Sequence, residues 1–215
     1  MGSNLSLSPL FNSNGLVGYW KFDETSGATS TDSSGNGNNG TLVNGPSWVS
    51  GKVGGALSFN GTTQYVSVAD NTSLNLTNAI TISFWLYQTS NYAPDGYIVT
   101  IYKNDMNGYM PRINNGTFDV AMAGNYHRNS GGAARLNTWL LGTITYDGTT
   151  ITNYINGVAV ASSSFFATIN ASGSALIIGS RGGSTEFYTG LIDDIRIYSR
   201  ALSAAEIMAL YNATN

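Results

Sequence analysis

Residues 80–87 read ITISFWLY, in which a purely apolar side chain occupies every even-numbered position. Side chains of an extended strand alternate between its two faces, so the even positions form one continuous apolar face. The odd positions carry hydroxyl and aromatic groups without charge, which suits a face covered by loops. The stretch therefore predicts a β-strand buried in a core on one side and covered on the other.

Turn signals divide the rest of the chain into further short strands. Asp147 begins one Gly- and Thr-containing turn, and Asn156-Gly157 forms another. Asn-Gly between apolar runs is a strong hairpin signal, because a type I′ turn needs positive φ at both central residues. Short strands separated by Gly, Asn, Asp and Ser predict a sandwich or a barrel. The further strands expected are 140–146, 151–155, 158–160, 176–178 and 191–198.

One helix is expected, at the C-terminal end of the chain. Ser203 suits its N-cap and Glu206 its third position, so the two residues can form a capping box. Leu202 before the cap and Ile207 after it can form a hydrophobic staple. A helix this short should be stable only when it is docked on the sheets. We therefore predict an all-β fold, a β-sandwich of two antiparallel sheets with a short C-terminal helix.

The domain organisation expected is simple, because the chain shows no internal repeat and no second patterned region. Residues 1–14 are polar and patternless, and we interpret them as a linker or an expression remnant. Residues 15–215 are long enough to bury one sizeable core and are expected to form one domain. We expect this domain to be part of a larger multidomain chain.

Composition narrows the range of functions. Only 10% of the 215 residues are charged, against about 25% in an ordinary domain. The polar surface must come from Asn, Ser, Thr and Gly, which favours an extracellular or cell-surface location. The nine basic residues are scattered, which argues against nucleic acid as a partner, and no apolar run is long enough for membrane insertion. There is no cysteine, so a Cys nucleophile and a thiolate metal site are excluded.

Three motifs carry a resemblance to a known family. They are GYWKFDE at 18–24 followed by DSSGNGNNGTL at 32–42, GGALSFNG at 54–61, and GLIDDIRIYSRALS at 190–203. Their order and spacing along 15–212 resemble the bacterial laminin-G-like jelly-roll family of the pentraxin and concanavalin-A-like group. The resemblance implies a jelly roll. It does not fix one function, because such domains include carbohydrate-binding modules, adhesion domains and spacers.

A metal site is predicted at the early glycine-rich loop. Residues 32–38 crowd oxygen donors between glycines, and Ca²⁺ takes six to eight oxygen ligands. A second carboxylate is available from Asp193, which the alternation places in one row with Ile195 in the core, where a bare charge is costly. The resemblance implies a structural Ca²⁺ between the early loop and this late strand. The ligands carried over are Asp32, Ser34, Asn36, Asn38 and Asp193.

An alternative without metal stays open. The loop can be satisfied by its own Asn and Ser side chains, with Asp193 paired to an arginine. The neighbouring Asp194 is expected to face solvent, and Asp70 is expected to have no part in stability or in calcium binding.

Catalytic constellations are missing from the sequence. His127 is the one histidine, Gly-x-Ser-x-Gly does not occur, and Glu24, Glu186 and Glu206 do not form an obvious acidic pair. Glu206 already belongs to the capping box, and Glu24 lies near the metal loop. We therefore expect no enzymatic activity.

A ligand site is expected on rim loops, where aromatic side chains and hydrogen-bonding groups gather. Sugars stack on aromatic faces, and charged groups bind their hydroxyls most strongly. The regions richest in such residues are 91–128 and 181–188, although tyrosine is also common in strands for packing alone. The candidate residues are Tyr92, Asn104, Asp105, Tyr126, His127, Arg128, Arg181 and Tyr188.

The function predicted is therefore a calcium-stabilised carbohydrate-binding or adhesion module of an exported protein, with a glycan or a cell-surface protein as its partner. The alternatives are a protein–protein adhesion or spacer domain without glycan affinity and, third, a polysaccharide hydrolase or lyase of the same fold.

Overall fold

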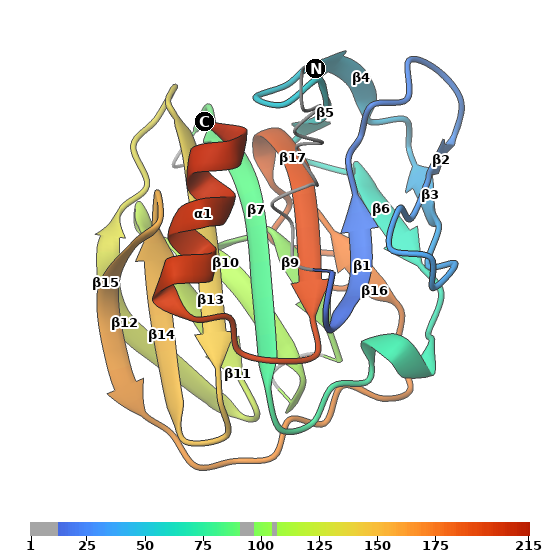
Figure 1. The fold of residues 1–215 in the computed structure, drawn as a ribbon. Coiled ribbons are helices and arrows are strands. Elements are labelled where there is room, and N and C mark those ends of the chain that lie inside the picture. The colour runs from blue at the N-terminus through green and yellow to red at the C-terminus, as the bar shows by residue number, and fades with distance from the viewer. Residues whose placement is uncertain (1–12, 91–96, 105–106) are drawn as a thin grey trace, which may run out of the picture.

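The computed structural model describes residues 13–90, 97–104 and 107–215, which form two sheets packed face to face (Figure 1). The strand pairs are antiparallel throughout the described sheets. The predicted sandwich with one C-terminal helix is confirmed.

The first sheet has eight strands, and the last strand of the chain lies inside it. Its order is β15 (Val158–Ser164), β14 (Thr150–Ile155), β13 (Trp139–Tyr146), β7 (Ile80–Gln88), β17 (Thr189–Tyr198), β5 (Gly55–Asn60) and β4 (Ser47–Ser50), with β1 (Leu16–Trp20) also paired to β17.

The second sheet has nine strands. Its order is β12 (Asn125–Ala133), β11 (Thr117–Met122), β10 (Tyr109–Asn114), β9 (Ile101–Lys103), β16 (Leu176–Ile178), β6 (Tyr65–Val68), β3 (Gly40–Val43) and β2 (Thr29–Ser30), with β8 (Tyr97–Val99) paired to β10. A short 3₁₀ helix, η1 (Thr72–Leu74), follows β6.

The core lies between the sheets and is built from the alternation that the sequence shows. The even positions of β7 are fully buried, and the Phe84 ring meets Phe118 of the second sheet edge-on at 5.9 Å. Gly142 in the neighbouring strand leaves room for the Phe118 ring, since an added Cβ would lie 2.8 Å from its Cζ atom. The two sheets therefore interdigitate as closely as a sandwich core requires.

The helix α1 (Ala204–Thr214) covers the outer face of the first sheet (Figure 1). Its capping box between Ser203 and Glu206 is confirmed. Trp85 of β7 is buried beneath it, with its ring 5.9 Å from that of Tyr211 and its Nε1 donating to Thr214 Oγ1 at 3.1 Å. The odd face of β7 is therefore covered as predicted, but by the helix rather than by loops alone.

A bulge in β17 changes the predicted faces of two carboxylates. Asp194 has φ of 54°, and the register with β7 shifts between Asp193 and Arg196. The extra residue reverses the alternation, so Ile192 and Ile195 both face the core. Asp193 therefore leaves the row of Ile195 to which the sequence assigned it. The expectation that Asp194 faces solvent is wrong, because it is 1% exposed.

Candidate functional site

The predicted calcium loop is closed by hydrogen bonds to Asp32. Oδ1 accepts from the backbone N–H groups of Tyr19 and Ser34, both at 2.9 Å. Oδ2 accepts from Ser34 Oγ at 2.8 Å and from Asn38 N at 2.9 Å. Four donors therefore point at this carboxylate and satisfy it without a cation. This arrangement corresponds to the alternative in which the loop holds itself.

The amides of the same loop are also engaged. Asn36 Nδ2 donates to Ser34 Oγ at 3.1 Å, and Asn38 Nδ2 donates to the carbonyl of Val17 at 2.8 Å and to Ser73 Oγ at 2.9 Å. Asn38 Oδ1 is buried and has no partner among the described residues. The loop is therefore held by its own hydrogen bonds and leaves one side-chain oxygen for a cation that takes six to eight oxygen ligands, and its calcium role stays a prediction.

Asp193 lies against a different segment, the turn between β4 and β5. Its Oδ2 accepts from Lys52 N at 2.9 Å and from Val53 N at 2.8 Å, and its buried Oδ1 has no partner in the part of the chain that the structure describes. Burial is the main cause that raises the pKa of Asp193 to about 7; the charges of Asp194 and Asp23 also raise it, against the two backbone hydrogen bonds. Asp193 and Asp32, which were predicted to share a metal, therefore accept hydrogen bonds from different segments of the chain.

An arginine was the alternative partner expected for Asp193. The nearby Arg196 pairs instead with Asp194. Arg196 Nη1 donates to Asp194 Oδ2, and Nη2 donates to the hydroxyl of Tyr19 at 2.7 Å. Both charged side chains are 2% exposed. Burial raises the pKa of the Tyr19 phenol well above its usual range, so it remains a neutral partner.

Asp23 holds the same β4–β5 turn from its other side. Its Oδ1 accepts from Gly55 N at 2.8 Å. Gly54 has φ of 70°, and an added Cβ would lie 2.2 Å from that oxygen, so only glycine fits. Two carboxylates from distant parts of the chain, Asp23 and Asp193, therefore fix one hairpin.

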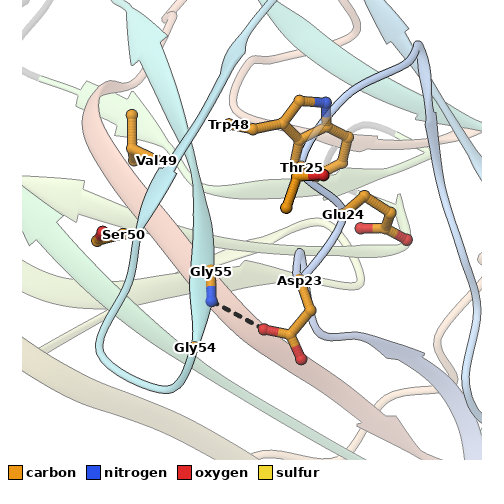
Figure 2. Close-up of a pocket in the computed structure, with 8 residues that line it drawn as sticks. All are labelled: Asp23, Glu24, Thr25, Trp48, Val49, Ser50, Gly54 and Gly55. Carbon is orange, nitrogen blue, oxygen red and sulfur yellow. Dashed lines mark hydrogen bonds between the residues drawn. The ribbon is translucent and has the colours of Figure 1, made fainter.

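A pocket of about 600 Å³ opens beside this hairpin, and we call it the Trp48 pocket (Figure 2). Figure 2 shows Asp23 and Glu24 on the segment that follows β1, across from the hairpin. The Trp48 indole donates to the carbonyl of Gly27 at 3.0 Å, which fixes the ring. The lining residues are Asp23, Glu24, Thr25, Trp48, Val49, Ser50, Gly54 and Gly55.

Glu24 gives this pocket a second carboxylate. Its Oε1 accepts from Thr31 N at 2.7 Å, whereas its Oε2 is buried and has no partner within residues 13–90, 97–104 and 107–215. The pocket therefore combines an aromatic ring, two carboxylates and exposed backbone. Ring faces and ionised acceptors are the groups that bind the C–H surfaces and hydroxyls of a sugar.

The ligand residues predicted on the rim loops differ in their burial and in their contacts. Tyr188 is fully buried and packs edge-on against Phe59 at 6.3 Å, so it belongs to the core and its predicted ligand contact is wrong. Arg181 donates to Glu186 at 3.0 Å, and Asn104 Nδ2 donates to the carbonyl of Asn170 at 2.5 Å. Both are held by these contacts, and their ligand roles stay predictions.

The other predicted ligand residues remain untested. Tyr92 and Asp105 lie outside the described residues. Tyr126, His127 and Arg128 lie in β12, the edge strand of the second sheet, where Val120 pairs with His127.

The Trp48 pocket was not predicted as a ligand site. Its residues come from segments about 30 positions apart, and each segment taken alone reads as a strand end or a turn. The available signal was the family motif that contains Asp23 and Glu24, which points to the fold but not to a ligand site.

Two further findings concern the described ranges only. In residues 13–90, 97–104 and 107–215, three or more His, Asp or Glu side chains do not gather into a metal-binding group. Over the same part of the chain, no helix is both long and apolar enough to span a membrane.

Comparisons with known proteins agree with the fold. A model of the Concanavalin A-like lectin/glucanases superfamily matches residues 60–208. Domain 4 of AbnA, a GH43 extracellular arabinanase from Geobacillus stearothermophilus in complex with arabinotriose, superposes with a TM-score of 0.73 and 21% identity, over 91% of this chain and 98% of that one. A search of curated proteins found no match.

Two toxin domains are also similar in structure. The binding domain of Paraclostridial Mosquitocidal Protein 1 superposes with a TM-score of 0.74 and 21% identity, over 94% of this chain and 52% of that one. The ligand binding domain of botulinum neurotoxin serotype D, in complex with N-acetylneuraminic acid, superposes with a TM-score of 0.67 and 16% identity, over 94% and 51%. The chain spans about half of each toxin domain, and these likenesses concern the fold.

Proposed function

Because the chain belongs to the concanavalin A-like lectin/glucanase superfamily, we propose that it is a non-catalytic carbohydrate-binding module whose glycan site is the Trp48 pocket. The observation that carries the proposal is the combination of the anchored Trp48 ring with the carboxylates of Asp23 and Glu24 in one opening of about 600 Å³. A pyranose or furanose ring can stack on the indole while its hydroxyls donate to the carboxylates.

The similar structures support a glycan as the ligand. Domain 4 of the arabinanase was solved with arabinotriose, and the neurotoxin domain with N-acetylneuraminic acid. The arabinanase domain is matched over 98% of its length, so its complex is the one that supports sugar binding by a sandwich of this fold.

A hydrolase of the same fold is the less favoured alternative. Glycosidases place two carboxylates on either side of the bond that they cleave. Asp23 and Glu24 are consecutive residues of one segment and lie together across from the hairpin (Figure 2). This placement favours recognition of hydroxyl groups over catalysis.

We also propose that the module works outside the cell or on its surface as part of a longer chain. The low share of charged residues supports this location, as does the likeness to one domain of an extracellular enzyme.

The calcium prediction continues as a proposal for a different set of residues. We propose that a structural Ca²⁺ would be held by Asp193 and Asp23 rather than by the loop at Asp32. Asp193 Oδ1 is buried and has no partner among the residues that the structure describes, and the charge of Asp23 raises the pKa of Asp193. A bound cation would neutralise these carboxylates and fix the β4–β5 hairpin, which forms one wall of the Trp48 pocket.

The test of the glycan proposal is a glycan array followed by calorimetric titration of the binders. Trp48→Ala should reduce the affinity of a bound glycan at least tenfold, which corresponds to loss of a stacking contact and its buried area. Phe166→Ala is the matched control, because Phe166 is an aromatic residue that is 77% exposed and outside the pocket. An array on which the wild-type domain binds no glycan would favour the adhesion or spacer alternative.

A further inference from the structure

A second, smaller pocket lies toward the opposite edge of the first sheet. It encloses about 260 Å³ where β13 begins and β14 ends. These strands are next to the β15 edge, whereas the Trp48 pocket lies at the β4 edge. We call it the Trp139 pocket; its lining residues are Ala133, Arg135, Thr138, Trp139, Leu140, Ile155 and Asn156.

An aromatic pair forms one wall of this pocket. Trp139 lies directly opposite Tyr87 in the register of β13 and β7, on the outer face of the sheet. The two ring centroids are 5.5 Å apart, and the rings are inclined at 56°. Both side chains are half-buried. The Trp139 ring is therefore supported from behind by Tyr87 and remains accessible from the pocket.

The charged group of this pocket is a cation, Arg135, whereas the charged groups of the Trp48 pocket are carboxylates. Arg135 is exposed and makes no hydrogen bond or ion pair within the described part of the chain. No carboxylate is among the residues that line this opening. Asn156 accepts from Leu141 N through Oδ1 at 2.9 Å, which anchors the amide and leaves its Nδ2 protons available. The pocket therefore offers hydrogen-bond donors beside an indole ring.

We propose that the Trp139 pocket is a second glycan subsite, selective for a sugar that bears a carboxylate. The inference rests on the proposed glycan function and adds the ligand class. The planar guanidinium of Arg135 matches a carboxylate through two parallel hydrogen bonds, and the Trp139 ring supplies the stacking surface. The carboxylates of the Trp48 pocket repel such a ligand, so the two subsites take sugars of different charge at opposite edges of one sheet.

The test uses pairs of sugars that differ mainly in the charged group. Trigalacturonate is compared with its methyl ester, and 3′-sialyllactose with lactose, by calorimetric titration at low ionic strength. The wild-type domain should bind at least one charged member about tenfold more tightly than its neutral partner, the usual size of a charge-assisted contact. Which pair shows the preference distinguishes a uronic acid from a sialic acid.

Substitutions at Arg135 and Trp139 test whether the preference for the charged sugar comes from the Trp139 pocket. Arg135→Gln should abolish the preference for the charged member, and Arg135→Lys should keep only part of it because an ammonium lacks the planar fork. Arg135 is exposed, so neither variant should change the melting temperature. Trp139→Ala should weaken binding of the charged sugar, whereas Trp48→Ala should leave that binding unchanged.

The possible outcomes separate this inference from the proposed function. The Trp48 site stands if neutral glycans bind and Trp48→Ala weakens their binding. The second subsite is nevertheless wrong if charged and neutral sugars bind alike, or if Arg135→Gln keeps the preference for the charged sugar. If glycans of both kinds fail to bind, both proposals are overturned. If Trp48→Ala abolishes binding of the charged sugar, that sugar binds in the Trp48 pocket, and the inference is overturned.

Discussion

The ammonium of the buried residue Lys103 lies 2.7 Å from Oδ1 of Asp70 and 2.5 Å from the carbonyl oxygen of Ser174. Asp70 Oδ2 also accepts from Gly173 N at 3.1 Å. The pair joins β9 to the segments that follow β6 and precede β16. This corrects the expectation that Asp70 has no part in stability, because no local pattern around residue 70 points to a distant lysine.

Asp70→Asn should therefore destabilise the domain. The variant leaves the Lys103 charge buried without a counter-ion, which costs roughly 1–3 kcal/mol. Urea unfolding followed by tryptophan fluorescence measures the change. The exposed Asp147, which accepts from Thr149 and Thr150 of its own turn, offers the control Asp147→Asn. Equal stability of Asp70→Asn and the wild type would contradict the prediction.

The stabilisation from Asp70 should depend on pH. The hydrogen bond from Lys103 is the main cause that lowers the pKa of Asp70, with the Lys103 charge and Gly173 acting in the same direction. The folded state thus favours the ionised carboxylate. Its contribution is present above the ordinary pKa of about 4 and is lost as the pH falls through the lowered value. The difference in unfolding free energy between wild type and Asp70→Asn should shrink below about pH 4. A difference that stays constant or grows there would refute this assignment.

The buried pair in the β17 bulge gives a second stability prediction. Asp194→Asn should destabilise the domain by roughly 3–5 kcal/mol, because Arg196 then remains buried without its carboxylate. Asparagine tolerates the positive φ of this position, so the backbone need not change.

The double variant Asp194→Asn/Arg196→Met is the matched control for that prediction. It removes the unpaired charge and should recover part of the lost stability. Urea unfolding of the two single variants and the double variant gives the coupling energy. Additive effects would show that the pair does not act as a unit.

Calcium should act through Asp193 and not through Asp32. Saturating Ca²⁺, at about 100 times its Kd, should raise the unfolding free energy of the wild type by roughly 2.7 kcal/mol over the metal-free form. Scanning calorimetry in Ca²⁺ and in EDTA measures this. Asp193→Asn should abolish the response, because it removes a ligand.

Asp32→Asn separates the two metal assignments. It should lower the melting temperature in both buffers, since it weakens the four hydrogen bonds of the loop, yet keep the calcium response. Loss of the response in Asp32→Asn alone would restore the early loop as the metal site. Identical wild-type unfolding curves in Ca²⁺ and in EDTA would show that calcium does not stabilise this domain.

Local patterns predicted the fold because they act over a few residues. The alternation of 80–87 identified the core face of β7, and the pair Ser203 and Glu206 identified the start of α1. Each signal depends on neighbours that are two to four positions apart. The rest of the fold then had only to provide the surfaces against which β7 and α1 pack.

The sites were harder to predict for the converse reason. A single residue in the left-handed region, Asp194, reverses the faces of β17, and nothing in IDDIR marks that position as a bulge. The Trp48 pocket needs Asp23, Trp48 and Gly55 to meet, and only the fold brings them together. Tyr188 looked like a loop tyrosine because its burial depends on Phe59, about 130 positions away.

The position of β17 determines how the first sheet can assemble. This strand lies between β7 and β5 and also pairs with β1, although it is the last strand in the chain. Without this strand, β7 and β5 would present unpaired edges, which favour aggregation. Completion of the first sheet during synthesis therefore requires residue 198 to have left the ribosome, and contacts of such long sequence separation slow folding.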